Sequence, residues 1–566
     1  MATLVLQTVG SAVGGAVGGP FGAAIGRALG GLAGSAIDGA LAGGSVRHVE
    51  GPRLKDVDGL TSTEGAPIPR LYGRARIGGQ LIWATRLEET VNTSIERNGA
   101  RGAKGAPRAT RTVTTTYAYW ANLAVGLCEG PIGFVRRIWA DGRELDLTTV
   151  TLRVHRGAED QPPDPLIVAK EGAENAPAYR GLAYVVFERL SLAEFGNRVP
   201  QFSFEIVRPV DGLGRMIRAV CLIPGATEFG LDPSPVTQKF GLGTTRPENR
   251  HQLQSPSDVI ASLDALQALC PNLERVSLVV SWFGDDLRAG HCTVTPRVEG
   301  ATKDTYGDAW ASAGLVRATA RTVSLVDGVP AYGGTPSDAG VVRLIGELKA
   351  RGIGVVLYPF VMMDIASGNA LPDPRTGAIG QPAYPWRGRI TCDPAPERTG
   401  TVDGTAEAAA QVAAFFGAVA PGDFSITGDT VAYAGPDEWS FRRHSLHLAH
   451  LAQAAGGVDG FILGSELIGL TRVRSGSGVY PAVAELKRLA GDLNAVLGPA
   501  TKLAYAADWT EYGAHVLGGG QEVRFPLDPL WADPAIDAIG IDFYPAALRL
   551  ARRSGPRRRL RGAQRL

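Results

Sequence analysis

The sequence has almost no charge imbalance and no closely spaced cysteines, and each shortage excludes a class of protein. Its 566 residues carry 57 basic and 56 acidic side chains, a net charge of +1. A chain-wide nucleic-acid binder has a basic excess, so no specific nucleic-acid site is predicted. The five cysteines lie far apart and form no CxxC pair, which argues against a zinc knot or a disulfide scaffold. We expect buried, reduced cysteines, and no motif predicts a metal or a cofactor.

The first 44 residues also lack charge, with only Arg27 and Asp38 among glycine, alanine and aliphatic side chains. No basic residue precedes Leu4, so the segment lacks the basic start of a signal peptide. Glycines recur four residues apart, a spacing that lets helices approach closely in lipid. The segment is therefore either flexible until assembly, or a helix that packs once neighbouring subunits or a membrane cover it. The spaced glycines are Gly14, Gly18, Gly22, Gly26 and Gly30.

Between residues 46 and 210, short apolar or aromatic runs alternate with glycine and proline turns, a pattern typical of β-strands. Examples are the runs Gln80–Thr85, Arg111–Ala121 and Leu182–Phe187. Residues 92–109 are basic and rich in glycine. This composition predicts a mobile, exposed loop that joins two strands of a hairpin.

From residue 211 to residue 545 apolar strand-like runs alternate with amphipathic helical runs, which indicates a parallel α/β arrangement. Six predicted strands fall short of a closed eight-stranded barrel, and a doubly wound open sheet is the alternative. The predicted strands are Met216–Ile223, Arg275–Phe283, Gly354–Met362, Gly460–Ser465, Lys502–Ala506 and Ala538–Asp542. The predicted helices are Pro256–Leu269, Ser337–Arg351, Asp437–Ala455 and Tyr480–Leu497. Residues 546–566 hold eight arginines and no acidic residue, which we interpret as a truncated or frame-shifted end rather than a basic tail.

Three stretches of the first half resemble the opening domain of phage tail hub and tip-attachment proteins. They are GLTSTEGAPIPRLYGRARIGGQLIWATRL (59–87), YAYWANLAVGLCEGPIGFVRRIWADG (117–142) and LSLAEFGNRVPQFSFE (190–205). The resemblance implies a mainly-β tail-hub domain over residues 46–210, after a Gly/Ala-rich apolar segment over residues 1–45.

The second half resembles the barrel domain of the large baseplate hub protein of gene transfer agents and related siphophage tails. The stretches that carry this likeness are AYGGTPSD (331–338), VLYPFVMMDI (356–365), PWRGRITC (385–392), GFILGSELIGLT (460–471), AYAADWTEY (504–512) and IDAIGIDFYP (536–545). The last three are also similar to retaining glycoside hydrolases. The resemblance implies a TIM-barrel glycoside-hydrolase-like domain over residues 211–545, incomplete at its C-terminus, followed by the Arg-rich tail 546–566.

This resemblance implies a structural baseplate or tail-tip hub whose barrel contacts cell-envelope glycan. The implied partners are other tail and baseplate proteins, further copies in a ring, the glycan, and a membrane contacted through residues 1–45. The protein would be made in the bacterial cytoplasm and end at the tail tip of the particle. The alternatives are an active retaining hydrolase that cuts envelope polysaccharide, and glycan binding without turnover.

The resemblance to retaining glycosidases makes Glu466, at the end of the fourth predicted strand, the candidate general acid/base. Such an enzyme needs a second carboxylate about 5–5.5 Å away. In the related enzymes it comes from the seventh strand, so we expect no turnover from this chain. Predicted sugar contacts at strand ends are Asp364, Trp386, Tyr505, Asp508, Trp509, Glu511, Asp542 and Tyr544.

Structural roles stay open for several of these residues. Asp508 and Asp542 could instead cap the helices that follow them, and the aromatic side chains could be packing residues. Trp282, Tyr358 and Phe543 are further aromatic candidates for the mouth of the barrel. The histidines His444, His447 and His450 recur on one helical face, and we expect that face to be solvated or part of an interface rather than a metal site.

Overall fold

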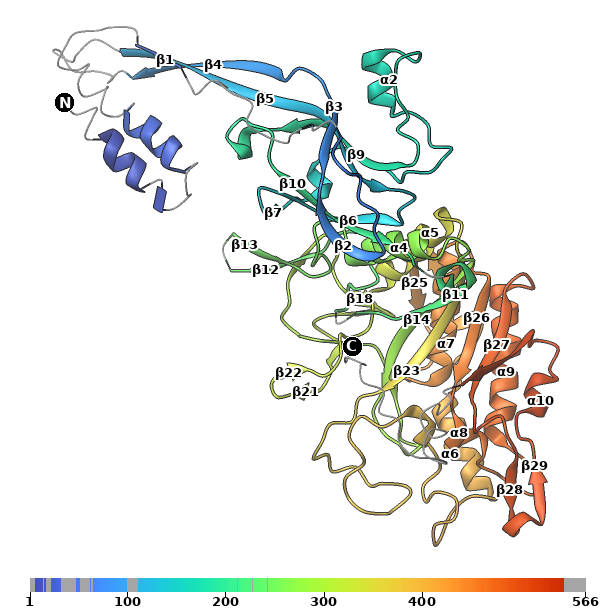
Figure 1. Ribbon diagram of the computed structural model, residues 1–566. Helices are drawn as coiled ribbons and strands as arrows, with labels where there is room; N and C mark the ends of the chain where they lie inside the picture. Colours follow the sequence, from blue (N-terminus) through green and yellow to red (C-terminus); the bar gives the residue numbers. More distant parts are fainter. Residues whose placement is uncertain are drawn as a thin grey trace, which may run out of the picture. The chain divides into compact units, whose positions relative to one another are not determined.

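The computed structural model describes residues 6–13, 15–16, 22–31, 47–50, 62, 65–98, 110–210, 212–225, 227–241 and 243–543. The chain divides into two compact units (Figure 1). The first consists of Met1–Arg215, Gln252–Ser255 and Asp264–Pro271. The second consists of Met216–His251, Pro256–Leu263 and Asn272–Leu566.

In the glycine-rich segment, residues 6–13 and 22–31 are helical. Two glycines let these stretches meet: a Cβ at Gly10 would overlap the carbonyl oxygen of Gly26, and one at Gly30 would overlap that of Leu6. The segment is thus helical in these two stretches. The two stretches contact each other, whereas the helical alternative expected contact with neighbouring subunits or a membrane. Gly14 and Gly18 lie outside the described residues. No helix in the described ranges is both long and apolar enough to cross a membrane.

The first unit is a sandwich of two mostly antiparallel sheets. The long strand β5 organises one sheet, because it pairs with β1, β3, β4 and β9. The sheets have the strand orders β1-β5-β9-β8, with β3 and β4 also on β5, and β2-β10-β6-β7. Their bounds are β1 Arg47–Glu50, β2 Gly73–Gly78, β3 Gln80–Ala84, β4 Glu88–Asn98, β5 Thr110–Glu129, β6 Phe134–Ala140, β7 Arg143–Glu144, β8 Leu152–His155, β9 Leu182–Ser191 and β10 Phe202–Arg208.

Alternating side chains explain why β5 is buried on both faces. Leu123 and Val125 face the core between the sheets, where they join Phe204 of the other sheet. Ala124, between them in sequence, faces a second cluster with Ile167 of helix α2 (Pro165–Glu171). This part of β5, which lies beyond the predicted run Arg111–Ala121, is therefore packed between the second sheet and α2.

The loop expected over residues 92–109 is shorter than predicted. Strand β4 continues to Asn98, which pairs with Thr110 of β5. Residues 92–98 are therefore strand, because β-branched Val91, Thr93 and Ile95 suit an extended ladder. Residues 99–109 lie outside the described residues.

The second unit is built on a parallel sheet whose strand order follows the sequence, β11-β14-β23-β26-β27-β30 (Figure 1). A doubly wound sheet reverses its order at a switch point, and no reversal occurs here, so that alternative is wrong. Within the described part of the chain the two edge strands do not pair, which leaves an open part of a barrel. The strands are β11 Ala219–Leu222, β14 Arg275–Gly284, β23 Gly354–Met363, β26 Gly460–Ser465, β27 Lys502–Asp508 and β30 Ala538–Asp542.

The helices mostly agree with the predicted pattern. Helix α5 begins where the Ser337 side chain accepts a hydrogen bond from the Gly340 N–H, and α9 begins with proline and ends before Gly498. Sequence patterning missed α6, and it extended the first strand over α3. The helices are α3 Leu213–Met216, α4 Asp258–Leu269, α5 Asp338–Ala350, α6 Ala406–Phe416, α7 Phe441–Ala454, α8 Ile468–Thr471, α9 Pro481–Leu497 and α10 Asp528–Trp531.

A segment between β14 and α5 contains only short strands and had no predicted elements. The short strands of the second unit are β12 Thr237–Phe240, β13 Thr244–Pro247, β15 Val294–Thr295, β16 Arg297–Val298, β17 Thr305–Tyr306, β18 Ala311–Ser312, β19 Leu315–Val316, β20 Arg321–Thr322, β21 Leu325–Val326, β22 Val329–Pro330, β24 Phe424–Thr427, β25 Thr430–Tyr433, β28 His515–Leu517 and β29 Glu522–Arg524.

The histidines of α7 are buried, so the expected solvated or interface face is wrong. His444 stacks on Trp282 with ring centroids 4.8 Å apart, and both side chains are buried. Burial and the neighbouring His447 lower the pKa of His444 to about 3. His447 lies 2.9 Å from Asp338, and His450 stacks on Phe424. These contacts also place Trp282 in the interior rather than at a mouth.

Candidate functional site

Acidic residues stand at the carboxyl ends of five neighbouring parallel strands. Asp364 follows β23 and Glu466 follows β26, while Asp508 and Asp542 end β27 and β30. Asp285 follows β14 in the same way. The registers align them, since Gly284 pairs with Met363 and Asp508 pairs with Asp542. Parallel strands bring such residues to one rim, the location of active sites in barrel enzymes.

Glu466 occupies a constrained position at this rim. Its φ of 51° lies in the left-handed region, which is uncommon for a residue other than glycine. Its backbone N–H donates to the Ala506 carbonyl at 2.9 Å, which ties it to β27. The side chain is buried, and its Oε2 accepts a 2.6 Å hydrogen bond from the Trp386 indole N–H. The Arg387 Nη2 lies 2.8 Å from the same oxygen.

Arg387 holds this arrangement together and was missed by the sequence analysis. Its Nε and Nη2 donate to Ser465, with the Nη2 to Oγ distance at 2.7 Å. Its guanidinium also lies over the Phe360 ring at 4.0 Å. The quoted stretch PWRGRITC contains Arg387 next to Trp386, but no periodic pattern indicated that this loop reaches Glu466.

Asp542 is electrostatically coupled to Glu466. Burial and the neighbouring Glu466 carboxylate raise the pKa of Asp542 to about 6, although Arg387 and the Tyr358 hydroxyl oppose the shift. Tyr358 donates to Asp542 Oδ2 at 3.3 Å. The chain therefore contains a carboxyl neighbour for Glu466 on the sixth strand, and it is one of the acidic residues predicted at the strand ends.

Exposed aromatic rings flank the two carboxyl groups. Trp386 is 40% exposed and Trp509 is 48% exposed. The Trp509 ring meets the exposed Phe543 ring edge to face at 6.4 Å, and its backbone N–H donates to the Asp542 carbonyl. Flat exposed faces of this kind suit the C–H side of a sugar ring. Tyr544 lies outside the described residues.

Asp364 is held in a buried ion pair, which argues against its predicted role as a sugar contact. Its side chain is fully buried, and Arg297 Nη1 lies 2.6 Å from its Oδ2. The Ser324 N–H and hydroxyl donate to the same carboxylate at 2.9 and 2.5 Å. Arg297 and Ser324 come from the segment of short strands, so sequence patterning gave no sign of this ion pair.

Tyr505 and Glu511 are also interior residues rather than sugar contacts. The Tyr505 hydroxyl donates to Glu511 at 2.7 Å and accepts from the Leu467 N–H at 2.9 Å. Thr471 donates to the same Glu511 oxygen at 2.7 Å. Burial raises the pKa of Glu511 to about 7 despite these hydrogen bonds. Together they fix the loops after β26 and β27 and so position Glu466.

Asp508 caps a turn, and no helix follows it as the structural alternative expected. Its Oδ1 accepts a hydrogen bond from the Thr510 N–H at 2.8 Å and another from the Thr510 hydroxyl. The turn it closes presents Trp509. Of the acidic candidates, Glu466 and Asp542 thus remain as groups that lie together beside exposed aromatic side chains.

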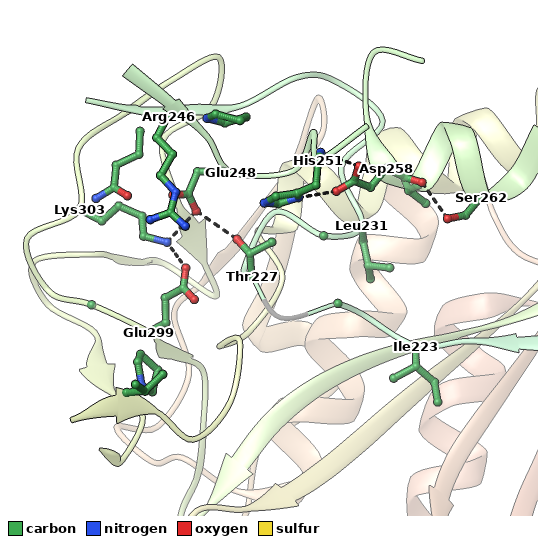
Figure 2. A pocket seen from close by; sticks show the side chains of 18 of the residues that line it. Ile223, Thr227, Leu231, Arg246, Glu248, His251, Asp258, Ser262, Glu299 and Lys303 are labelled. Atoms are coloured by element: carbon green, nitrogen blue, oxygen red, sulfur yellow. Dashed lines mark hydrogen bonds and ion pairs between the residues drawn. The ribbon is translucent and has the colours of Figure 1, made fainter. Parts of the chain in front are cut away.

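A cavity of about 780 Å³ lies elsewhere in the second unit, and Figure 2 shows side chains that line it. Oxygens of Glu228, Glu248 and Glu299 lie within 4.8 Å of one another, a spacing that could suit a cation. The Lys303 ammonium already bonds all three, at 3.3 Å from Glu228 and 2.7 Å from Glu248. Arg317 adds a second cation 2.8 Å from Glu228. We interpret the cluster as a buried ion-pair network that anchors this segment.

Fold and rim together define the class of this protein. Its second unit is an α/β sheet wound in one direction like a TIM barrel, with carboxyl groups and exposed aromatics where barrel enzymes bind their ligands. Residues 439–551 match the family model described as the GTA TIM-barrel-like domain. The match includes β26, β27 and β30, and therefore both Glu466 and Asp542. This segment is similar to the gene-transfer-agent (GTA) TIM-barrel-like domain, and the predicted relation to gene transfer agents is confirmed to that extent.

Three solved structures are similar to parts of the chain. A chain in the structure titled "Virion of native gene transfer agent (GTA) particle" is 45% identical, with 36% of this chain and 44% of that chain covered and a TM-score of 0.23. The present chain thus spans less than half of that protein. Two structures of GH113 beta-1,4-mannanase are 14% and 15% identical, with TM-scores of 0.23 and 0.22, and each match covers 48% of this chain and 51% of the mannanase. At these TM-scores the superpositions carry no argument. No curated protein matches the chain.

Proposed function

We propose that the protein is a structural component of the tail tip of a gene transfer agent or related phage-type tail, and that its barrel rim binds cell-envelope glycan. The observation that carries the proposal is the pair Glu466 and Asp542, which lies beside Trp386 and Trp509 at the rim. Carboxylates accept hydrogen bonds from sugar hydroxyls, and exposed indole faces stack on sugar rings.

Binding without turnover fits this geometry better than hydrolysis. Glu466 Oε2 already accepts from Trp386 and lies 2.8 Å from Arg387, so this oxygen acts as an acceptor and not as a proton donor. A general acid in a glycosidase must carry its proton toward the leaving oxygen. In this arrangement Asp542, whose pKa is raised to about 6, is the carboxyl group that keeps its proton to the higher pH.

The binding proposal is tested by titrating envelope polysaccharide fragments against the purified chain and two variants. Trp509→Ala removes an exposed ring and should weaken binding about tenfold, because stacking contributes ~0.5–1.5 kcal/mol beyond area burial. Tyr306→Ala removes another exposed aromatic, 55% exposed on β17, and should leave the affinity unchanged. Equal affinity of the wild type and Trp509→Ala would contradict a stacking site at the rim.

The structural role is tested on particles from the source organism. We propose that the protein contacts other tail and baseplate proteins and further copies of itself, and that residues 1–45 approach the membrane. The match of residues 439–551 to the GTA TIM-barrel-like domain supports a particle location. Antibody detection should find the protein in purified particles at the tail tip, and its absence from them would overturn this role.

The second candidate function is retaining hydrolysis of the same glycan. It is favoured by the coupling of Asp542 to Glu466 and by the raised pKa of Asp542, because such hydrolysis needs two neighbouring carboxyl groups, one of which carries a proton. Here Asp542 would serve as the acid. Release of reducing sugar by the wild type, abolished in both Glu466→Gln and Asp542→Asn, would establish hydrolysis. No release by any of the three would leave binding as the activity.

A further inference from the structure

A second cavity opens at the carboxyl ends of β14 and β23, on the same edge of the parallel sheet as Glu466. Its volume is about 420 Å³, and it is lined mainly by polar and charged side chains. Those that carry the following argument are Asp285, Asp286, Arg288, His291 and Arg321.

The carboxylates of this cavity are already fully used as acceptors. Asp285 accepts from the Thr293 N–H and hydroxyl at 2.8 and 2.7 Å, and from Arg321 Nη1 at 2.8 Å. Asp286 accepts from Arg288 Nη2 at 2.6 Å and from the Gln381 amide at 2.7 Å. A metal ion would have to displace these donors, so the acidic residues are not free ligands.

Arg321, in contrast, keeps unused donors on an exposed side chain, whereas the Arg288 side chain is only 15% exposed. Arg321 is 58% exposed and gives only Nη1 to Asp285, while Arg288 gives Nε and Nη2 to Asp286. The exposed His291 side chain has no hydrogen-bond partner among the described residues. The buried Asp364, which also lines the cavity, is paired with Arg297, a guanidinium whose Nε and Nη2 have no partner in the described ranges.

We propose that this cavity binds an anionic substituent of the envelope glycan, a carboxylate or a phosphate group, through Arg321. The proposal rests on the proposed function, since it adds a charge-selective subsite to the same rim. Planar guanidinium groups bind carboxylate and phosphate oxygens with two parallel hydrogen bonds. The inner layer of paired carboxylates fixes the guanidinium groups in place, which lowers the ordering cost of binding.

The test compares three probes by calorimetry: a uronic acid oligomer, the same oligomer with its carboxyl groups reduced to alcohols, and that neutral oligomer carrying phosphate groups. The wild type should bind at least one anionic probe about tenfold more tightly than the neutral one, because hydrogen bonds to charged groups are the stronger kind. The preferred anionic probe identifies carboxylate or phosphate. The preference should shrink as salt is raised.

Variants of two exposed arginines, Arg321 on β20 and Arg275 on β14, distinguish a specific subsite from a general effect of charge. Arg321→Ala should reduce the preference to less than about twofold and leave neutral binding unchanged. Arg275→Ala is the matched control, because Arg275 is 60% exposed at the opposite end of β14 and should keep the full preference. Arg321→Lys, which keeps the charge but loses the planar fork, should give an intermediate preference.

The outcomes are distinguishable. Equal affinity of the wild type for all three probes would overturn the subsite and leave glycan binding at the rim standing. A preference that survives Arg321→Ala, or that Arg275→Ala also removes, would overturn the subsite as well. Weaker binding of every probe to Trp509→Ala, with the preference for the anionic probe retained, would support both the stacking site and the anionic subsite. If the wild type binds none of the probes, both proposals are wrong.

Discussion

Asp164 in the first unit and Asp542 in the second are the same residue type in opposite settings. Arg153 contacts both Asp164 oxygens, at 2.7 and 3.0 Å, and His155 lies 2.9 Å away. Burial alone would raise the pKa of Asp164, but these partners lower it to about 2. Asp542 has a carboxylate neighbour instead, and its pKa rises to about 6. A compensated buried charge supports a fold, whereas an undercompensated one is available for chemistry or binding.

The largest expected loss of stability comes from removing the buried charge of Asp164, which Arg153 and His155 compensate. Asp164→Asn should reduce the free energy of unfolding of the first unit by about 3 kcal/mol, because Arg153 and the start of α2 both lose a partner. Urea denaturation followed by the fluorescence of that unit checks it. Glu194→Gln is the control, since its ion pair with Arg143 is exposed, and should cost under about 0.5 kcal/mol.

The pH dependence of the two aspartates should run in opposite directions. The folded pKa of Asp164 lies below the ordinary 3.8, so its stabilisation of about 2 kcal/mol is present above pH 4 and is lost as the pH falls toward 2. The folded pKa of Asp542 lies above 3.8, so stability should fall by about 1–3 kcal/mol as the pH rises from 4 to 6. Unfolding curves of Asp542→Asn should lack that fall, and an unchanged fall would contradict the assignment.

A third comparison concerns the glycine-packed helical stretches near the N-terminus. Gly30→Ala places a methyl group against the backbone of Leu6, so the two stretches should separate at a cost of about 1–3 kcal/mol. Gly31→Ala meets only the side chain of Gln7, which can move, and should be tolerated. Faster amide hydrogen exchange over residues 6–13 in Gly30→Ala alone is the expected result. Equal exchange in both variants would show that the contact contributes nothing.

The smallest effect should come from Glu511, the interior carboxyl group that positions the rim. Burial raises its pKa from 4.5 to about 7, so at pH 4 it is protonated in both states and Glu511→Gln should change the free energy of unfolding by less than about 1 kcal/mol. The wild type should lose stability as the pH rises from about 4.5 to 7, because the unfolded chain releases this proton while the folded chain keeps it, and the variant should lack that loss. A variant that loses stability as the pH rises from about 4.5 to 7 would contradict this role.

Sequence patterning predicted the strands well because burial on both faces demands continuous apolar runs, as in Gly460–Ser465 and Ala538–Asp542. It placed Glu466 at a strand end for the same reason. It could not show that Asp542 adjoins Glu466, since that depends on how the sheet curves across β27. Nor could it show that Arg387 pairs with Glu466 and Arg297 with Asp364, because both arginines come from segments without periodicity.

The direct test of the central claim is a titration of the Asp542 carboxyl group by carbon NMR, in the wild type and in Glu466→Gln, with Asp542→Asn identifying the signal. We expect a pKa near 6 in the wild type and a lower pKa in Glu466→Gln, because the neighbouring negative charge has been removed. An ordinary aspartate pKa in both proteins would show that the two carboxyl groups do not form a coupled pair, and the rim site described for this protein would then be wrong.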